Sequence, residues 1–289
     1  MSKLSTVISF VLLTTLASAA LNPAAYTAAV ELYTQRKPLE AQKAFEALAA
    51  TAPDNADVQF YLGRLALQRN DPEPAVAYLE KAVALSPKDS RMQHRLGDAY
   101  GITAQKAGLF SKMSWAGKCR TAYEKAIELD PKNIDARWSL MDYCRQAPGI
   151  AGGGNDKALV QALEIKKLNL DRGRIAVALV YASDKKYDLA FGEFEEALKV
   201  NPTDYMALFQ AGRLAAISGE RLDRGLEVLR QCVARTPPEG QPGHAAVHWR
   251  IGNILEKKSD LPGARAAYEA ALKVDPRFAQ AIESLTKLN

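Results

Sequence analysis

The feature that most constrains this chain is a 34-residue stretch, 56–89, whose pattern predicts two short amphipathic helices joined by a turn. Asn70-Asp71-Pro72 interrupts the chain between the two helices, and Ser86-Pro87 ends the second one, because proline cannot continue a helix and restrains the residue before it. Small residues such as Gly63 and Ala75 let the two backbones approach closely. One hairpin of this kind cannot bury its apolar face, so the pattern predicts copies of itself on either side.

The rest of the chain supplies those copies at a similar spacing. Pro53 lies 34 residues before Pro87, and the later turn positions follow at intervals of 32 to 44 residues: Pro131, Leu170, Pro202, Pro237 and Pro276. A Leu-Gly pair or its equivalent recurs in four first helices, at Leu62-Gly63, Leu96-Gly97, Ala211-Gly212 and Ile251-Gly252. A bulky residue lies eight positions before most of the turn prolines: Phe45, Leu79, Tyr123, Phe194, Leu229 and Tyr268.

A helix–turn–helix unit with a period near 34 residues resembles the tetratricopeptide repeat, and the resemblance covers nearly all of residues 20–289. It implies an all-α fold, a right-handed superhelical solenoid of about seven repeats. The repeats are expected near residues 22–55, 56–89, 90–133, 134–170, 171–204, 205–239 and 245–276. Residues 277–289 predict one more amphipathic helix, which would cap the last repeat.

The composition is that of a folded protein, with 48% hydrophobic and 25% charged residues. The net charge of +5 is modest for 289 residues, and no dense Lys/Arg cluster with interleaved aromatic residues occurs. The composition therefore argues against a nucleic-acid partner.

The first nineteen residues predict a secretory signal peptide. Lys3 gives a positive start, the run from Val7 to Leu16 is apolar but short for a membrane span, and Ala17-Ser18-Ala19 matches a cleavage site. We expect cleavage before Ala20; the alternative is an uncleaved membrane anchor. The mature chain is then expected to be exported without a transmembrane segment, most simply to a bacterial periplasm, with secretion as the second option.

Three cysteines without a CxxC spacing, Cys119, Cys144 and Cys232, argue against a disulfide framework or a zinc site. All three occupy positions where the repeat needs a small core residue, which favours buried thiols; a Cys119–Cys144 disulfide is the alternative. His244 and His248 lie four residues apart, but no third metal ligand accompanies them. Because nucleophile and phosphate-loop motifs are absent as well, the sequence predicts no enzyme activity, no cofactor and no metal.

Three segments depart from the repeat. The first, within residues 101–118 of the third unit, carries Lys112 and Trp115, and predicts either a membrane-touching or partner-binding element or an extended helical hairpin. The second, residues 146–156, occupies the same turn of the fourth unit, so the two are expected to be neighbours on one edge of the solenoid. The third, residues 237–244, lies between units and is expected on the opposite edge.

The second segment also carries a candidate anion site. Gly152, Gly153, Gly154 and Asn155 precede a predicted helix, and backbone N–H groups at such a position can bind negative charge. The alternative is a plain loop in which Asn155 or Asp156 caps the helix.

In proteins of the family that this chain resembles, the first helices line a concave groove that binds protein or peptide segments. The resemblance places the fifth positions of the first helices in that groove: Tyr26, Phe60, His94, Trp138, Ile175, Phe209 and Trp249. Charged residues four positions later share the same face: Arg64, Asp98, Asp142 and Arg213. Aromatic side chains would anchor a partner and charges would set its register. The alternative is that the aromatic residues pack between helices as core.

The sequence therefore predicts a non-enzymatic repeat scaffold that binds a protein or peptide partner in the cell envelope. Binding would use the concave face and the paired turns of the third and fourth units. The alternative is a protein that binds a small anion or glycan at residues 152–156, with Lys112 nearby. Membrane-surface contact through residues 110–115 is a further hypothesis.

Overall fold

The computed structural model describes residues 21–238 and 240–288. Within these ranges the chain is helical, with fifteen α-helices, one 3-10 turn at Gly149–Ala151 and no strand. The chain divides into two compact units, Met1–Leu129 and Asp130–Asn289, and each is described by itself. The predicted signal peptide, residues 1–19, lies outside the described residues.

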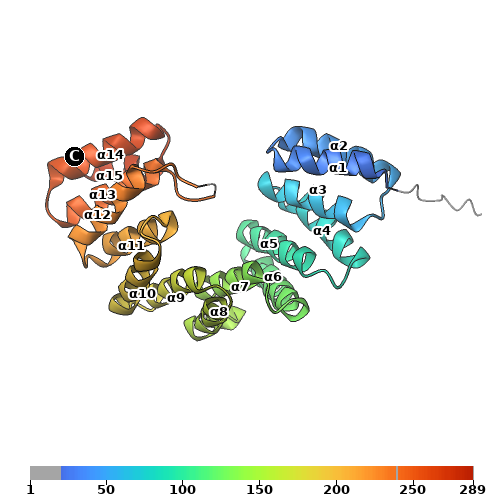
Figure 1. Ribbon diagram of the computed structural model, residues 1–289, viewed down its shortest axis with the longest axis horizontal. Helices are drawn as coiled ribbons and strands as arrows, with labels where there is room; N and C mark the ends of the chain where they lie inside the picture. Colours follow the sequence, from blue (N-terminus) through green and yellow to red (C-terminus); the bar gives the residue numbers. More distant parts are fainter. Residues whose placement is uncertain (1–20, 239, 289) are drawn as a thin grey trace, which may run out of the picture. The chain divides into compact units, whose positions relative to one another are not determined.

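Unit 1 consists of three helix hairpins (Figure 1). The first helices of the hairpins are α1 (Pro23–Thr34), α3 (Ala56–Gln68) and α5 (Ser90–Lys106). The second helices are α2 (Pro38–Thr51), α4 (Pro72–Leu85) and α6 (Leu109–Leu129). Helix α2 also packs on α3, and α4 packs on α5, so each hairpin buries its apolar face against the next one.

Unit 2 repeats this arrangement four times and adds a terminal helix. Its first helices are α7 (Ile134–Gln146), α9 (Leu170–Ser183), α11 (Tyr205–Ser218) and α13 (His244–Lys257). Its second helices are α8 (Asn155–Leu168), α10 (Tyr187–Val200), α12 (Leu222–Val233) and α14 (Leu261–Val274). Helix α15 (Ala279–Lys287) packs on α14 and buries Ala281 against Tyr268. The all-α prediction and the expected number of repeats are confirmed.

Local sequence explains where the helices begin. Six of the seven first helices start after an Asn or Asp whose side chain accepts hydrogen bonds from backbone N–H groups of the first turn: Asn22, Asn55, Asp89, Asn133, Asn169 and Asp204. Four of these caps lie two residues after a turn proline. The proline stops one helix and the cap starts the next, which fixes the length of the repeat.

The small residue of the first helix lets the two helices of a hairpin approach closely. A Cβ atom on Gly63, Gly97, Gly212 or Gly252 would lie only 2.3 to 2.5 Å from a side-chain carbon of the second helix. Those carbons belong to the bulky residues of the repeat: Leu79, Tyr123, Leu229 and Tyr268. The sequence pattern predicts the close approach of the two helices at these glycines, and the structure identifies the side chains that they contact.

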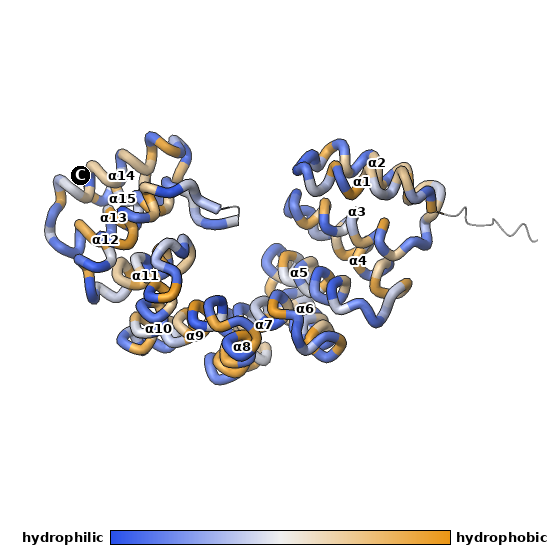
Figure 2. The backbone as a smooth tube through the Cα atoms, in the orientation of Figure 1, coloured by the Kyte–Doolittle hydropathy of each residue, from blue (hydrophilic) through white to orange (hydrophobic). Residues whose placement is uncertain are grey.

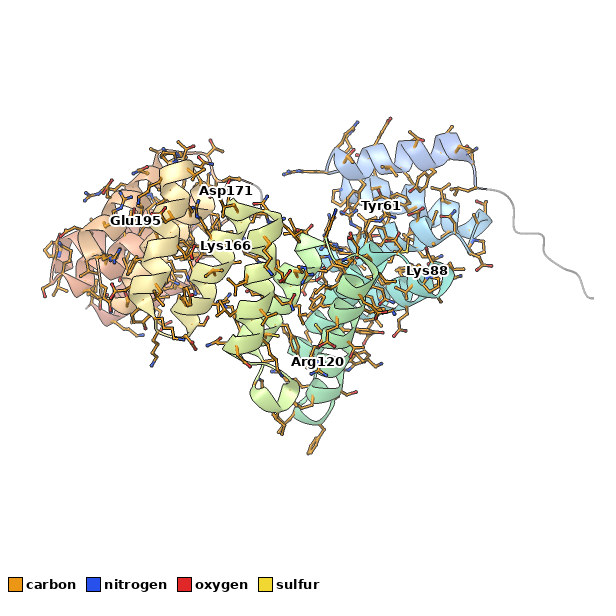
Figure 3. The ribbon with its side chains drawn as sticks, turned by 60° about the horizontal axis from the view of Figure 1, so that its bottom comes forward. Tyr61, Lys88, Arg120, Lys166, Asp171 and Glu195 are labelled. Atoms are coloured by element: carbon orange, nitrogen blue, oxygen red, sulfur yellow. The ribbon has the colours of Figure 1, made fainter. Side chains whose placement is uncertain are left out.

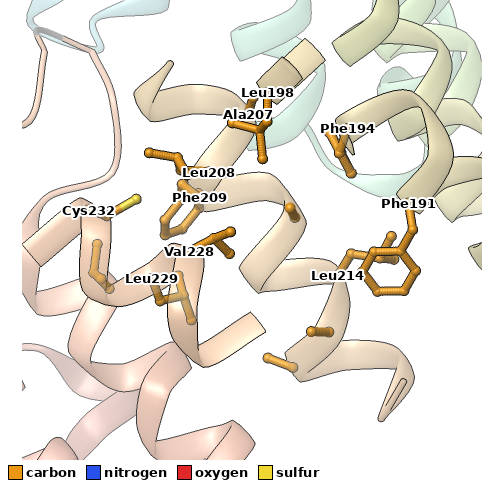
Figure 4. Packing of buried hydrophobic residues seen from close by; sticks show 14 of the residues in the cluster. Phe191, Phe194, Leu198, Ala207, Leu208, Phe209, Leu214, Val228, Leu229 and Cys232 are labelled. Atoms are coloured by element: carbon orange, nitrogen blue, oxygen red, sulfur yellow. The ribbon is translucent and has the colours of Figure 1, made fainter. Parts of the chain in front are cut away.

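Apolar residues recur at helical spacing along the helices of both units (Figure 2). In unit 2 the buried residues from α9 to α13 form one continuous cluster, part of which is shown in Figure 4. It includes Phe191 and Phe194 of α10, Phe209 of α11 and Leu229 of α12. Among the described helices, none combines the length and the apolar character that a membrane crossing requires.

The segment expected to be inserted in the third unit lengthens both of its helices. Helix α5 has 17 residues and α6 has 21, and only Ala107 and Gly108 separate them. Residues 101–118 therefore form an extended helical hairpin, in which Trp115 packs on Tyr100 while Phe110 is exposed. Its contact with a membrane or a partner stays a prediction. The departure at residues 146–156 is instead a short 3-10 turn followed by glycines.

A first prediction concerns the close contact at Gly97. Gly97→Leu should lower the free energy of unfolding by about 1–3 kcal/mol, because the added side chain must displace the buried Tyr123 ring. Denaturant unfolding followed by circular dichroism measures this change. The matched control is Gly117→Leu on α6, where no atom lies within 4 Å of an added Cβ. Equal stability of the two variants would contradict the assigned register.

A second prediction concerns the three cysteines, which are all buried and form no disulfide in the described residues. Burial raises the pKa of Cys119 and of Cys232 to about 12. Because the thiolate is the reactive form, iodoacetamide should modify none of the three at neutral pH until the protein unfolds. Intact-mass measurement should also show the same native mass with and without reductant. A gain of two hydrogens on reduction would contradict three free thiols and would leave the Cys119–Cys144 disulfide to be tested by peptide mapping.

Candidate functional site

Unit 1 uses several of its predicted partner-binding residues for internal packing. Phe60 and His94 are each only 4% exposed. Tyr26 meets the rings of Phe45 and Tyr61 edge-on, with a centroid distance of 6.3 Å to each. Burial raises the pKa of the Tyr26 hydroxyl to about 12. These contacts are those of core residues between helices.

The two predicted charges of unit 1 are also engaged within the unit. The Arg64 guanidinium lies 4.6 Å from the centroid of the Tyr33 ring. Asp98 accepts hydrogen bonds from Arg95 Nη1 at 2.8 Å and from the Tyr123 hydroxyl at 2.9 Å. Burial, and secondarily the Asp98 charge, hold the pKa of Tyr123 far above its usual range. Asp98 therefore stabilises the contact between α5 and α6.

Unit 2 likewise buries Ile175 and Phe209, which are 4% and 5% exposed. The Trp249 indole donates to Ser284 Oγ at 3.1 Å and meets the Phe278 ring edge-on at 6.0 Å, so it holds the terminal helix α15 in place. These side chains therefore pack between helices as core, which was the alternative to partner binding. Trp138, Asp142 and Arg213 have different surroundings.

Trp138 lines a cavity of about 510 Å³ at the amino-terminal ends of first helices in unit 2. The other lining residues come from α9, from the start of α11 and from the segment before α13: Arg172, Ile175, Asp204, Tyr205, Met206, Pro238 and Gln241. The Arg172 guanidinium lies 5.6 Å from the Trp138 ring centroid. A cavity of this size, apolar with a few polar groups, suits one bulky side chain or a small molecule.

One polar atom of the cavity wall has no partner. Gln241 Oε1 is buried and makes no hydrogen bond among the described residues. The backbone beside it is held in place, since the Tyr205 hydroxyl donates to the Pro242 carbonyl oxygen at 2.7 Å. A ligand group that donates a hydrogen bond would satisfy Gln241, because buried polar atoms are normally paired.

A row of arginines continues from Trp138 along the first helices. Asp142 accepts hydrogen bonds from the Trp138 indole and, at 2.6 Å, from Arg145 Nη1. Burial raises the pKa of Asp142, although both partners favour its charged form. Arg145 and Arg213 together line a second, smaller cavity of about 110 Å³. We call Arg145, Arg213 and Arg250 the arginine row.

Two members of the arginine row lack a carboxylate partner in the described part of the chain. Arg213 Nη1 donates to Gln210 Oε1 at 3.2 Å. The Arg250 guanidinium lies 4.0 Å from the Trp249 ring centroid, and its buried Nε makes no hydrogen bond. Burial and the Arg145 charge lower the pKa of Arg213, and burial and the Arg213 charge lower the pKa of Arg250 to about 10. Partly buried, mutually repelling guanidinium groups favour the approach of an anion.

The three glycines of the loop in unit 2 do not offer their own amides to an anion. The N–H groups of Gly152, Gly153 and Gly154 donate to the carbonyl oxygens of Gly149, Pro148 and Cys144 at 2.8 to 3.1 Å. Neither Asn155 nor Asp156 caps α8, because Gly154 is the N-cap residue and no side chain bonds to the first turn. The Asn155 amide instead donates to Asp184 Oδ1 at 2.6 Å.

The remaining predicted positions are placed as follows. Lys112 and Trp115 lie on α6 in unit 1, whereas the glycine loop belongs to unit 2, so their joint use stays a prediction. His244 Nε2 lies 2.7 Å from the Arg235 carbonyl oxygen. Burial and the neighbouring His244 lower the pKa of His248. No group of three or more His, Cys, Asp or Glu side chains in the described ranges is arranged to hold a metal ion.

Sequence reasoning missed Arg145, Arg250 and Gln241, because it considered only the fifth and ninth positions of the first helices. One signal was present in the sequence. Arg213 and Arg250 have no Asp or Glu three or four residues away, which is unusual for arginines on a solvated helix face. The role of Gln241 follows only from the folded path of the segment before α13.

Known proteins share this architecture. Two family models, both described as tetratricopeptide repeat, match residues 26–90 and 214–282 and residues 104–133. A solved tetratricopeptide repeat protein from Parabacteroides merdae is 14% identical and superimposes with a TM-score of 0.67, covering 92% of this chain and 97% of that one. A thermophilic repeat protein from Thermus thermophilus is 19% identical with a TM-score of 0.55, covering 66% of this chain and 97% of its own. At these identities the likeness concerns the fold.

Two curated relatives are much longer than this chain. The peroxisomal targeting signal receptors of Komagataella phaffii and Komagataella pastoris are each 25% identical over 185 residues, which is 62% of this chain. The chain spans only 30% of those receptors. The family models together cover more than half of the chain and agree with its seven helix hairpins and their spacing. The chain belongs to the tetratricopeptide repeat family.

Proposed function

We propose that this protein is a non-enzymatic scaffold that binds a segment of a partner protein along the first helices of unit 2. Tetratricopeptide repeat proteins generally mediate protein–protein interactions, and the Komagataella relatives are named as receptors for a targeting signal. We also propose that the chain acts in the cell envelope, which its amino-terminal sequence supports.

The observation that carries this proposal is the continuous path from the Trp138 cavity to the arginine row. The path offers a concave apolar site at Trp138 and two guanidinium groups, on Arg213 and Arg250, that no carboxylate neutralises in the described residues. A peptide with one bulky apolar side chain and nearby Asp or Glu residues fits these features. Its carboxylates would pair with the guanidinium groups of Arg213 and Arg250 in charge-assisted hydrogen bonds.

The same geometry favours binding over catalysis. Asp142 and Arg145 are paired with one another at 2.6 Å. The Trp138 indole adds a hydrogen bond to that pair. Of the charged residues that line the Trp138 cavity, Arg172 pairs with Asp135 at 2.9 Å, and Asp204 accepts a hydrogen bond from the first turn of α11. These groups hold a surface in shape and leave no proton donor and acceptor poised at a reacting centre. The glycine loop gives the anion or glycan alternative less support, because the N–H groups of Gly152, Gly153 and Gly154 are already bonded to backbone carbonyl oxygens.

A third prediction tests the ligand chemistry. Random peptides displayed on phage and selected against the purified chain should converge on an apolar residue flanked by Asp or Glu. Arg213→Gln should lower the affinity of the selected peptides about tenfold, since a paired charge is lost, and Trp138→Ala should have an effect of similar size. Fluorescence anisotropy with labelled peptides measures both changes.

The matched control for the charge is Lys273→Gln, which removes one positive charge from the exposed last turn of the second helix α14. This variant should bind the selected peptides as the natural chain does. Selected peptides without acidic residues, or with equal affinity for Arg213→Gln and the natural chain, would contradict the proposed site. Crosslinking and mass spectrometry on the native protein would then identify the natural partner.

A fourth prediction tests the proposed location. Expressed with its full amino terminus in a Gram-negative host, the protein should be recovered from the periplasm with Ala20 as its first residue. Ala19→Arg should block processing, because the residue before the cut must be small, whereas Ser18→Arg at the neighbouring position should not. Amino-terminal sequencing reads both results, and a natural chain that still starts at Met1 would contradict export by cleavage.

A further inference from the structure

The tip of the α5–α6 hairpin exposes large apolar side chains to solvent. Phe110 is 98% exposed, Leu109 is 81% exposed and Met113 is 43% exposed. The three residues lie in the first turn and a half of α6, at spacings of three and four residues, so they share one side of the helix. We call residues 106–113 the hairpin tip.

The hairpin tip stands on a rigid support. Trp115 of α6 packs on Tyr100 of α5 with ring centroids 5.6 Å apart, and the Lys118 ammonium lies 4.3 Å from the Trp115 ring centroid. The Tyr100 hydroxyl donates to Glu80 Oε1 at 2.7 Å, which ties the hairpin to α4. In Figure 3 the hairpin extends beyond Arg120, away from the other helices of unit 1. The exposed residues are therefore displayed by a helix that packs on α5 and not by a loop.

The outer part of the hairpin carries positive charge and no negative charge. Between Asp98 and Glu124 the sequence contains four basic residues, Lys106, Lys112, Lys118 and Arg120, and no Asp or Glu. Lys106 closes α5 at the tip, and Lys112 lies in the first turns of α6 beside the exposed apolar residues. Other exposed apolar residues have a different setting: Leu39, 75% exposed, lies next to Glu40.

We propose that the hairpin tip inserts into the surface of a bilayer that contains anionic phospholipids. Phe110 and Leu109 would enter the boundary between headgroups and acyl chains, while Lys112 would contact the lipid phosphates. Lys106, whose ammonium donates to the Asn70 carbonyl oxygen, would add positive charge nearby. A convex apolar tip offers no groove to a peptide, whereas a lipid surface can close around it. Charge complementarity assigns the anionic lipid. The inference is independent of the peptide site in unit 2.

The experiment is co-sedimentation of the purified mature chain with vesicles. Vesicles of phosphatidylcholine with phosphatidylglycerol should bind the chain, and vesicles of phosphatidylcholine alone should bind it much more weakly. Phe110→Asp should reduce binding about tenfold or more, because one large apolar side chain is lost from the bilayer. The matched control Leu39→Asp changes an equally exposed residue beside mixed charges and should bind normally.

Two further variants test how positive charge contributes to vesicle binding. Lys112→Glu should reduce binding to the anionic vesicles about tenfold, whereas Lys43→Glu on α2, with the same change in net charge, should have a much smaller effect. Because these side chains are exposed, circular dichroism should show all variants folded. A Phe110→Trp variant should also shift its added fluorescence to the blue when anionic vesicles are present.

Absence of binding to anionic vesicles would overturn the proposal. So would binding that survives Phe110→Asp, or an unshifted emission of the Phe110→Trp variant. Concentration-dependent dimerisation that Phe110→Asp abolishes, without vesicle binding, would assign the tip to a protein contact and would equally overturn the bilayer proposal.

Discussion

In four of the seven repeats, a glycine of the first helix lies against a bulky side chain of the second helix at a distance that leaves no room for a Cβ atom. This contact sets how closely the two helices pack, and the stacking of the hairpins depends on it. Where the bulky residue is a tyrosine, its hydroxyl also binds a polar group of the first helix: Tyr123 binds Asp98, and Tyr268 binds Asn253. The packing contact and the hydrogen bond together fix the pair of helices.

Within each unit, neighbouring hairpins are joined by further contacts. In unit 2, Lys166 of α8 pairs with Glu193 of α10 at 2.6 Å, and Glu195 of α10 pairs with Arg224 of α12 at 2.9 Å. The apolar core runs alongside these pairs (Figure 4). Because each hairpin is stabilised mainly by its neighbours, most aromatic residues of the first helices, Phe60 and Phe209 among them, are needed as core.

The features that the repeat leaves unsatisfied are the ones that suggest function. Arg213 and Arg250 are partly buried without a carboxylate, and Gln241 keeps a buried oxygen without a partner among the described residues. At the hairpin tip, Phe110 is almost fully exposed and takes no part in the core of the repeat. Such groups cost stability in the isolated chain, and a bound partner or lipid surface would remove that cost.

The sequence by itself determined the helical fold, the number of hairpins and the close approach of the helices at glycines such as Gly63 and Gly97, because all of these follow from local periodicity, turn chemistry and side-chain size. It also located the segments that depart from the repeat, but not their shapes. Only the tertiary structure decided that residues 101–118 lengthen two helices, and that the amides of Gly152, Gly153 and Gly154 are already bonded. Only the tertiary structure brought Arg145, Arg213 and Arg250 from three helices into one row. Their proximity depends on how successive hairpins stack, and residue spacing within one hairpin does not determine it.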